Sequence, residues 1–104
     1  MINSLARVRE NEIAFAITRI AATQSTGIAT LARCKKEIPD LVKLSNADWK
    51  ESETRPGEPL WHQLIRNIKS HCDSPGNYVN EGYLEHLPRV GYRVTDAGRR
   101  KKKP

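Results

Sequence analysis

The sequence has little of what several classes of protein are built from. Only 6% of its 104 residues are aromatic and 38% are hydrophobic. One hydrophobic core is feasible at this size, but a deep substrate pocket is not expected. No paired-carboxylate motif, nucleophile–base motif or phosphate-binding loop is visible. The chain is therefore predicted to be a binding module and not an enzyme.

Cysteine is scarce as well. Cys34 and Cys72 lie far apart and form no CxxC pair, so reduced thiols in a cytoplasmic protein are expected. The three histidines are also potential metal ligands, but no pair of these residues has the spacing of a zinc site. The sequence predicts no metal site and no cofactor.

Long hydrophobic runs are also lacking. The apolar stretch 13–22 is interrupted by Arg19 and follows Glu10 and Glu12, which do not fit a signal-peptide core. The stretch is too short to span a membrane. No membrane partner and a cytoplasmic location are expected.

Basic residues, in contrast, are abundant at one end. Residues 1–88 contain eleven Lys or Arg and eleven Asp or Glu, whereas residues 89–104 contain seven basic residues against Asp96 alone. The whole net charge of +6 therefore lies in the last sixteen residues. Such a basic end is typical of a phosphate binder, and equally of a solvated tail that aids solubility.

Hydrophobic spacing predicts helices in the first half of the chain. A helix is expected from about Ser4 to Ala22, followed by a short strand at 27–30. Thr30 is expected to cap a second helix that Pro39 interrupts, with Asp40 capping a further turn. Residues 45–57 are polar and are expected to form a loop with one turn around 47–49.

The second half shows one strong helical pattern and then an alternating one. Pro59 suits the first position of a helix over 58–72, whose apolar residues Leu60, Trp61, Leu64, Ile65 and Ile68 form one stripe. Residues 83–95 predict a hairpin that turns at 88–91. The predicted fold class is mainly α with a small β-hairpin, in one domain over 1–98 with a basic disordered tail over 99–104.

Two segments resemble a known family. Gly82-Tyr83-Leu84 and the run from Gly91 to Arg99 are similar to the wing of bacterial winged helix-turn-helix proteins. The run from Trp61 to His71 resembles the preceding helix in winged-helix domains attached to restriction endonucleases, including HNH and Mrr-like enzymes. The resemblance covers roughly residues 25–100 and implies double-stranded DNA as the partner, with a nucleoid-associated location. No nuclease domain is present, so a free-standing protein, an excised reader domain and a subunit of a larger system are all open.

The expected DNA contacts lie on the second-half helix, the hairpin and the tail. Arginine suits guanine, and asparagine or glutamine suits adenine, in the major groove. Basic residues at the hairpin tip and tail suit phosphates. The candidates are His62, Gln63, Arg66, Asn67, Lys69, Ser70, His71, Arg89, Arg93, Arg99, Arg100 and Lys101. His71 equally suits a helix C-cap, and Trp49 suits either packing under its loop or stacking on a base.

Several functional alternatives stay open. Transcription regulation and target recognition for a restriction or defence system would use the same surface, and methylated bases are one candidate target. A protein-interaction adaptor without DNA binding is the alternative from another class. The first helix could complete the core or form a homodimer seam, and a nuclease or other partner subunit is a further candidate partner.

Overall fold

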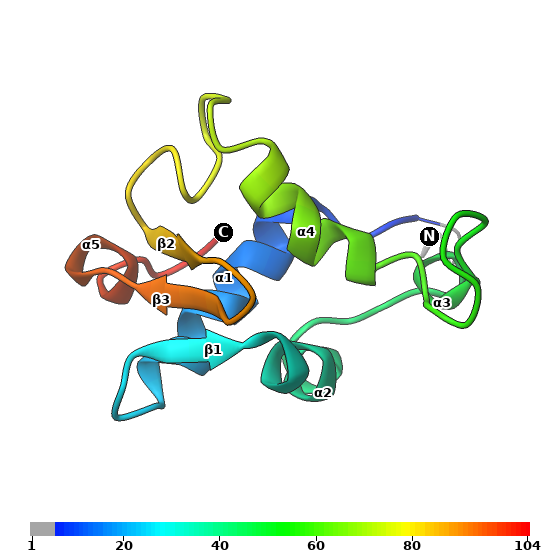
Figure 1. Cartoon of the computed structure of the whole chain (residues 1–104), viewed down its shortest axis with the longest axis horizontal. Coiled ribbons are helices and arrows are strands. Elements are labelled where there is room, and N and C mark those ends of the chain that lie inside the picture. Colours follow the sequence, from blue (N-terminus) through cyan, green and yellow to red (C-terminus); the bar gives the residue numbers. More distant parts are fainter. Residues whose placement is uncertain (1–5) are drawn as a thin grey trace.

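Five helices and one small sheet make up the described part of the chain, residues 6–104 of a computed structural model (Figure 1). The elements in order are α1 (Glu10–Ala22), β1 (Ile28–Thr30), α2 (Leu31–Leu41), α3 (Asn46–Trp49), α4 (His62–Ser70), β2 (Leu84–Leu87), β3 (Gly91–Val94) and α5 (Asp96–Arg99). The predicted class, mainly helical with a small hairpin, is confirmed at this level.

Helix α1 is the centre of the core and contacts α2, α4, α5 and the sheet. Its buried isoleucines, Ile13, Ile17 and Ile20, recur at the spacing of one helix face. The helix begins at Glu10, later than predicted, because the Val8 N–H instead donates to the carboxylate of Asp48. The predicted start at Ser4 lies outside the described residues.

The sheet is antiparallel with strand order β1-β3-β2. Its inner face carries Ala29, Tyr92 and His86 side by side, and the opposite face carries Ile28, Arg93 and Glu85. Gly91 is required where β3 meets β1, since a Cβ there would lie 2.0 Å from the carbonyl oxygen of Ala29. The predicted strand and hairpin are confirmed.

Helix α2 differs from the prediction at Pro39, which does not interrupt it. The helix begins as expected, with the Thr30 hydroxyl accepting the Arg33 N–H, but it continues through Pro39 to Leu41. Pro39 stands in the last turn, so only one hydrogen bond of the helix is lost, and the Val42 N–H still reaches the Ile38 carbonyl. Asp40 therefore lies inside α2 and caps no further turn.

Helix α4 is shorter at both ends than the predicted 58–72. Glu51 and Pro59 form an isolated antiparallel bridge, and the Leu60 N–H donates to Lys50. These contacts pair Pro59 and Leu60 with the preceding loop, so the helix begins at His62 and Pro59 is not its first residue. The helix ends at Ser70, because the side-chain amide of Asn77 donates a hydrogen bond to the Ile68 carbonyl. The loop turn around 47–49 is confirmed as α3.

Candidate nucleic-acid interface

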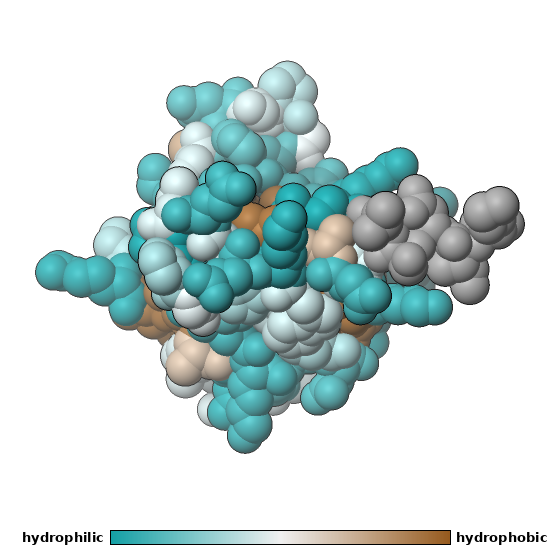
Figure 2. All heavy atoms as spheres, turned by 90° about the vertical axis from the view of Figure 1, so that its right-hand side faces the viewer, coloured by the Kyte–Doolittle hydropathy of each residue, from teal (hydrophilic) through white to brown (hydrophobic). Residues whose placement is uncertain are grey.

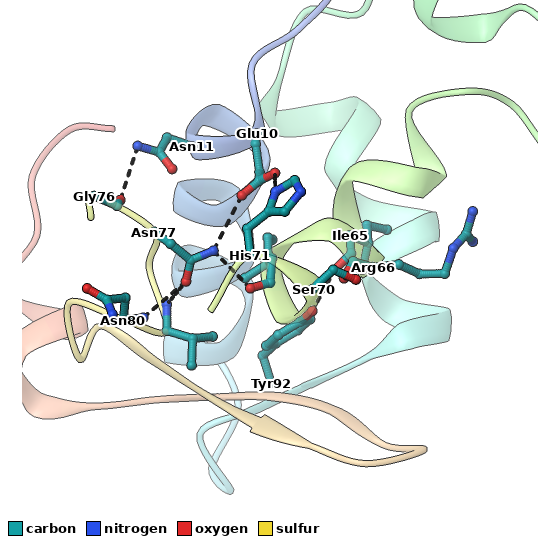
Figure 3. A network of polar contacts seen from close by, with 12 residues as sticks. Glu10, Asn11, Ile65, Arg66, Ser70, His71, Gly76, Asn77, Asn80 and Tyr92 are labelled. Carbon is teal, nitrogen blue, oxygen red and sulfur yellow. Dashed lines mark hydrogen bonds and ion pairs between the residues drawn. The ribbon is translucent and has the colours of Figure 1, made fainter. Parts of the chain in front are cut away.

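Helix α4 is held firmly by its apolar side. Trp61, Ile65 and Ile68 are buried in the core, as the sequence predicted. The Tyr92 hydroxyl on β3 donates to the Ile65 carbonyl over 2.6 Å, and the Asn77 amide donates to the Ile68 carbonyl over 2.9 Å (Figure 3). A side chain from the sheet and one from the following loop thus fix the position of α4.

The opposite side of α4 is polar and open to solvent. Gln63, Arg66, Asn67 and Ser70 share this side, because residues three and four apart are neighbours on a helix. His62 and Lys69 lie together on one flank. We call these six residues the α4 face. Gln63 and Lys69 are exposed, and Lys69 forms no ion pair within residues 6–104, whereas the Ser70 hydroxyl donates to the Arg66 carbonyl.

A charged cluster occupies the N-terminal end of the α4 face. The Arg66 guanidinium lies 2.6 Å from a Glu58 carboxylate oxygen, and the Arg66 side chain is 33% exposed. Burial alone would raise the pKa of Glu58, but Arg66, His62 and Lys35 together lower it below 4.5. Arg66 is therefore partly neutralised in the unliganded protein, and an incoming phosphate or base would compete with Glu58 for its donors.

His62 lies in the same cluster and is only partly exposed. Burial and the positive charges of Lys35 and Arg66 lower its pKa below 6.5, while Glu58 acts in the other direction. Its Nδ1 is buried with no hydrogen-bond partner among residues 6–104. The burial and the neighbouring positive charges thus favour the neutral imidazole.

One of the predicted helix residues, His71, lies away from the α4 face. His71 is the C-cap of α4, and its Nδ1 lies 2.8 Å from the Glu10 carboxylate on α1. Figure 3 shows His71 directed toward Glu10 and Arg66 directed away from it. Asn67 lies on the α4 face, because it is four residues from Gln63 and three from Ser70, and it is half-buried. The structure therefore does not bring all the predicted helix residues together.

The hairpin turn lies beside the start of α2. The Val90 carbonyl accepts the Leu31 N–H over 2.9 Å. Arg89, inside this turn, is exposed and has a φ of 63°, a conformation that turns the chain back sharply. Arg93 points to the outer face of the sheet and pairs with Glu85 over 2.8 Å. Of the two predicted hairpin residues, Arg89 alone is at the turn, and within residues 6–104 it forms no ion pair.

The predicted tail residues lie at the other end of the sheet. β3 leads from the hairpin turn to α5, which includes Arg99 and therefore extends one residue past the predicted domain boundary. Arg99, Arg100 and Lys101 line an open hollow together with Lys102 and with Arg19 of α1. The Lys101 ammonium lies 4.8 Å from the centre of the Tyr83 ring. The disorder predicted for 99–104 stays a prediction.

Sequence reasoning missed two basic residues that stand beside the predicted ones. Lys35 on α2 lies close enough to Glu58 and His62 to affect the pKa of both. Arg19 comes from α1 and joins the tail residues. The sequence predicted the helix that carries Lys35, but only the packing of α2 and α4 on α1 brings Lys35 near the α4 face. No pattern in the sequence signals the approach of Arg19 to the tail.

Two remaining features bear on other kinds of site. Trp49 is 50% exposed and packs edge-on against Trp61, with ring centres 5.7 Å apart, so it combines packing with accessibility. Within residues 6–104 no group of three potential ligands is arranged to hold a metal ion, and no helix there is long and apolar enough to cross a membrane.

Comparison with known proteins gives no relative from which a role can be transferred. No family model matches the chain, and no characterised protein and no solved structure matches it. Functional inference therefore depends on the arrangement of the residues described above.

Proposed function

We propose that the chain is a winged helix-turn-helix domain. The supporting observation is the order of its elements, in which a helix, a short strand and further helices precede a hairpin. The sheet order β1-β3-β2 places the hairpin next to the strand before α2, and its turn lies beside the start of that helix. In this arrangement α2 and α4 are the two helices of the helix-turn-helix and β2–β3 is the wing.

Within that class, the proposed function is binding of double-stranded DNA, with α4 in the major groove. The single observation that carries the proposal is the α4 face, a polar helix surface held rigidly from behind by Tyr92 and Asn77. A helix that projects polar side chains from a rigid core suits recognition of base edges. Lys35 stands beside it on α2, Arg89 is exposed at the hairpin turn, and both are proposed contacts to the DNA backbone.

Gln63 and Arg66 are the proposed base-contacting residues. Gln63 is exposed and offers both a donor and an acceptor, which suits adenine, whereas a guanidinium suits guanine. Glu58 holds Arg66 in the free protein, and we propose that it disfavours sequences that cannot displace it. Transcription regulation and target recognition in a restriction or defence system both fit this surface.

The test is a titration of the full chain against a randomised duplex pool, with and without methylated adenine and cytosine, at two salt concentrations. The proposal predicts enrichment of a sequence or a modification and a steep decrease of affinity with salt. In the double variant Gln63→Ala, Arg66→Ala, affinity for the enriched duplex should fall about 10- to 100-fold, since a good bidentate contact contributes about 1–3 kcal/mol.

The matched control is Gln24→Ala, Arg55→Ala, which removes the same residue types from a partly exposed and an exposed position outside α4. Its affinity should equal that of the unmodified chain. An α4 variant that binds the enriched duplex as tightly as this control would remove α4 from the interface.

One observation favours the second candidate, a protein-interaction adaptor without DNA binding. Leu31 and Val90 are 37% and 42% exposed and lie side by side at the hairpin turn. However, the face with α3 and the loop before α4 is mainly hydrophilic, with apolar atoms in small separate areas (Figure 2). Absence of DNA binding at low salt would favour the adaptor.

A further inference from the structure

The strongest concentration of unpaired charge lies away from α4, between α1 and α5. An open hollow of about 800 Å³ is lined by Arg19, Arg99, Arg100, Lys101 and Lys102, with no acidic residue among them. A smaller hollow of about 260 Å³ adjoins it and adds the side chains of Thr18 and Thr23. We call the five basic residues the cationic hollow.

Tertiary packing brings these charges together. The Thr95 hydroxyl accepts the Gly98 N–H and begins α5, and Gly98 is required because a Cβ there would lie 2.2 Å from the Tyr83 carbonyl oxygen. This close approach directs the chain after α5 toward the end of α1, where Arg19 stands. Lys101 lies over the rings of Tyr83 and Tyr78, at 4.8 and 5.6 Å.

The cationic hollow has no internal counterion. Within residues 6–104 none of its five members takes part in an ion pair, whereas Arg66 and Arg93 on the other elements do. Like charges held close together repel, and bound anions would relieve that repulsion. The hollow therefore has the chemistry of a site for an anion that carries several negative charges.

The lining residues also indicate the type of anion. Five cations along one open surface match a row of phosphates better than a single small anion, which a closed pocket would hold. No asparagine or glutamine lines either hollow, so the side chains that suit adenine are not present. Contacts of this kind are independent of sequence.

The hollow and the α4 face lie on different sides of the molecule. β3 separates the hairpin turn from α5, which are at opposite ends of the sheet, and Figure 1 shows α5 and α4 well apart. Figure 3 shows Arg66 directed away from α1, the helix that carries Arg19. A straight duplex seated on α4 would not enter the hollow.

We propose that the cationic hollow is a second binding site, for the phosphate backbone of double-stranded DNA, so that one molecule bridges two DNA segments. The bridging rests on the proposed function of the α4 face, whereas the anion site itself does not. The hollow would hold any duplex, while the α4 face selects its target.

The experiment is a capture assay with the full chain. A duplex that carries the enriched sequence is immobilised on beads, the protein is added, and capture of a second, fluorescent duplex of unrelated sequence is measured. The hollow variant is Arg99→Gln, Arg100→Gln, Lys102→Gln. The matched control, Lys43→Gln, Lys50→Gln, Arg55→Gln, removes the same charge from exposed positions elsewhere.

The unmodified chain and the control should capture the second duplex, and the amount captured by the hollow variant should be at least tenfold lower. The hollow variant should still bind the immobilised duplex within about threefold in a separate anisotropy titration. Capture by the hollow variant at the level of the control would overturn the proposal, and that result is also expected if a dimer bridges through two α4 faces. Capture of single-stranded RNA in place of the duplex would overturn the choice of ligand.

The α4 variant Gln63→Ala, Arg66→Ala distinguishes the two proposals. If both are correct, it loses selective binding to the immobilised sequence but keeps weak, salt-sensitive binding to any duplex through the hollow. If it keeps selective binding while the hollow variant loses capture, the proposed function of α4 fails and the hollow remains a DNA site.

Discussion

The α4 face and the cationic hollow differ in how their charges are arranged. On the α4 face Arg66 is paired with Glu58, and the helix beneath it is fixed by hydrogen bonds from Tyr92 and Asn77. In the hollow five basic residues lie together without an acid, and four of them come from the short helix α5 and the residues after it. The first surface has few charges in defined positions, and the second has many charges and few constraints.

This difference indicates a division of roles. Base recognition needs donors and acceptors placed by a rigid support, because a contact out of position contributes little discrimination. Phosphate binding needs only positive charge, and it tolerates mobile side chains. The net charge of +6, which the sequence places in its last sixteen residues, is therefore informative about phosphate binding and says little about specificity.

The largest expected effect is on the free energy of unfolding, which should depend on the residues beneath α4 far more than on those of the cationic hollow. Trp61→Ala removes a fully buried side chain beneath α4 and should lower the free energy of unfolding by about 3–5 kcal/mol. Arg100→Ala, in the hollow, should change it by at most about 0.5 kcal/mol. Urea unfolding followed by circular dichroism measures both. Equal effects would mean that the hollow is as integral to the fold as α4.

Asp48 should make the support of α4 sensitive to acid. Burial alone would raise its pKa, but hydrogen bonds from Ser45, Val8 and Arg7 lower it below 3.8. A lowered carboxyl pKa stabilises the fold above the unfolded value, and that stability is lost as pH falls through the folded pKa. The Asp48 carbonyl also accepts the Trp61 N–H, so this loss reaches the start of α4.

The measurement for Asp48 is thermal unfolding at pH 7 and at steps down to pH 3. Asp48→Asn should cost about 1.5–3 kcal/mol at pH 7, the range for hydrogen bonds to a charged group, and should flatten the acid dependence. Glu53→Gln, in the exposed loop, is the control and should leave both unchanged. An unaltered acid profile in Asp48→Asn would assign the acid sensitivity to other groups.

Tyr92→Phe tests the hydrogen bond between the sheet and α4. Loss of the 2.6 Å bond to the Ile65 carbonyl should lower the free energy of unfolding by about 1 kcal/mol, because the ring still fills its place in the core. Selectivity between the enriched and an unrelated duplex should decrease as α4 loses this support. Binding of an unrelated duplex through the hollow should not change. Equal losses on both duplexes would show that the two surfaces are not independent.

Glu58→Gln should have the smallest effect and the opposite sign. A partly exposed ion pair contributes about 0.2–1 kcal/mol, so freeing Arg66 should raise DNA affinity by up to about fivefold. The gain should be larger for unrelated duplexes than for the enriched one, if Glu58 disfavours wrong sequences. Anisotropy titrations with Glu51→Gln as control measure this, and weaker binding by Glu58→Gln would mean that Glu58 positions Arg66 for DNA.

The sequence alone determined the elements whose signals are local. The stripe of Trp61, Ile65 and Ile68 predicted the buried side of α4, Thr30 predicted the cap of α2, and alternation predicted the hairpin. These features depend on neighbours within a few residues, so spacing and residue type suffice to predict them. The polar side of α4 followed from the same stripe.

Only the tertiary structure decided which candidate residues meet. Because Glu51 pairs with Pro59, α4 begins only at His62. The contact between His71 and Glu10 holds His71 against α1. Packing of separate elements placed Lys35 beside the α4 face and Arg19 beside the tail. Such tertiary contacts join residues that are far apart in the chain. The energy of each contact depends on distances between elements, which no local sequence pattern encodes.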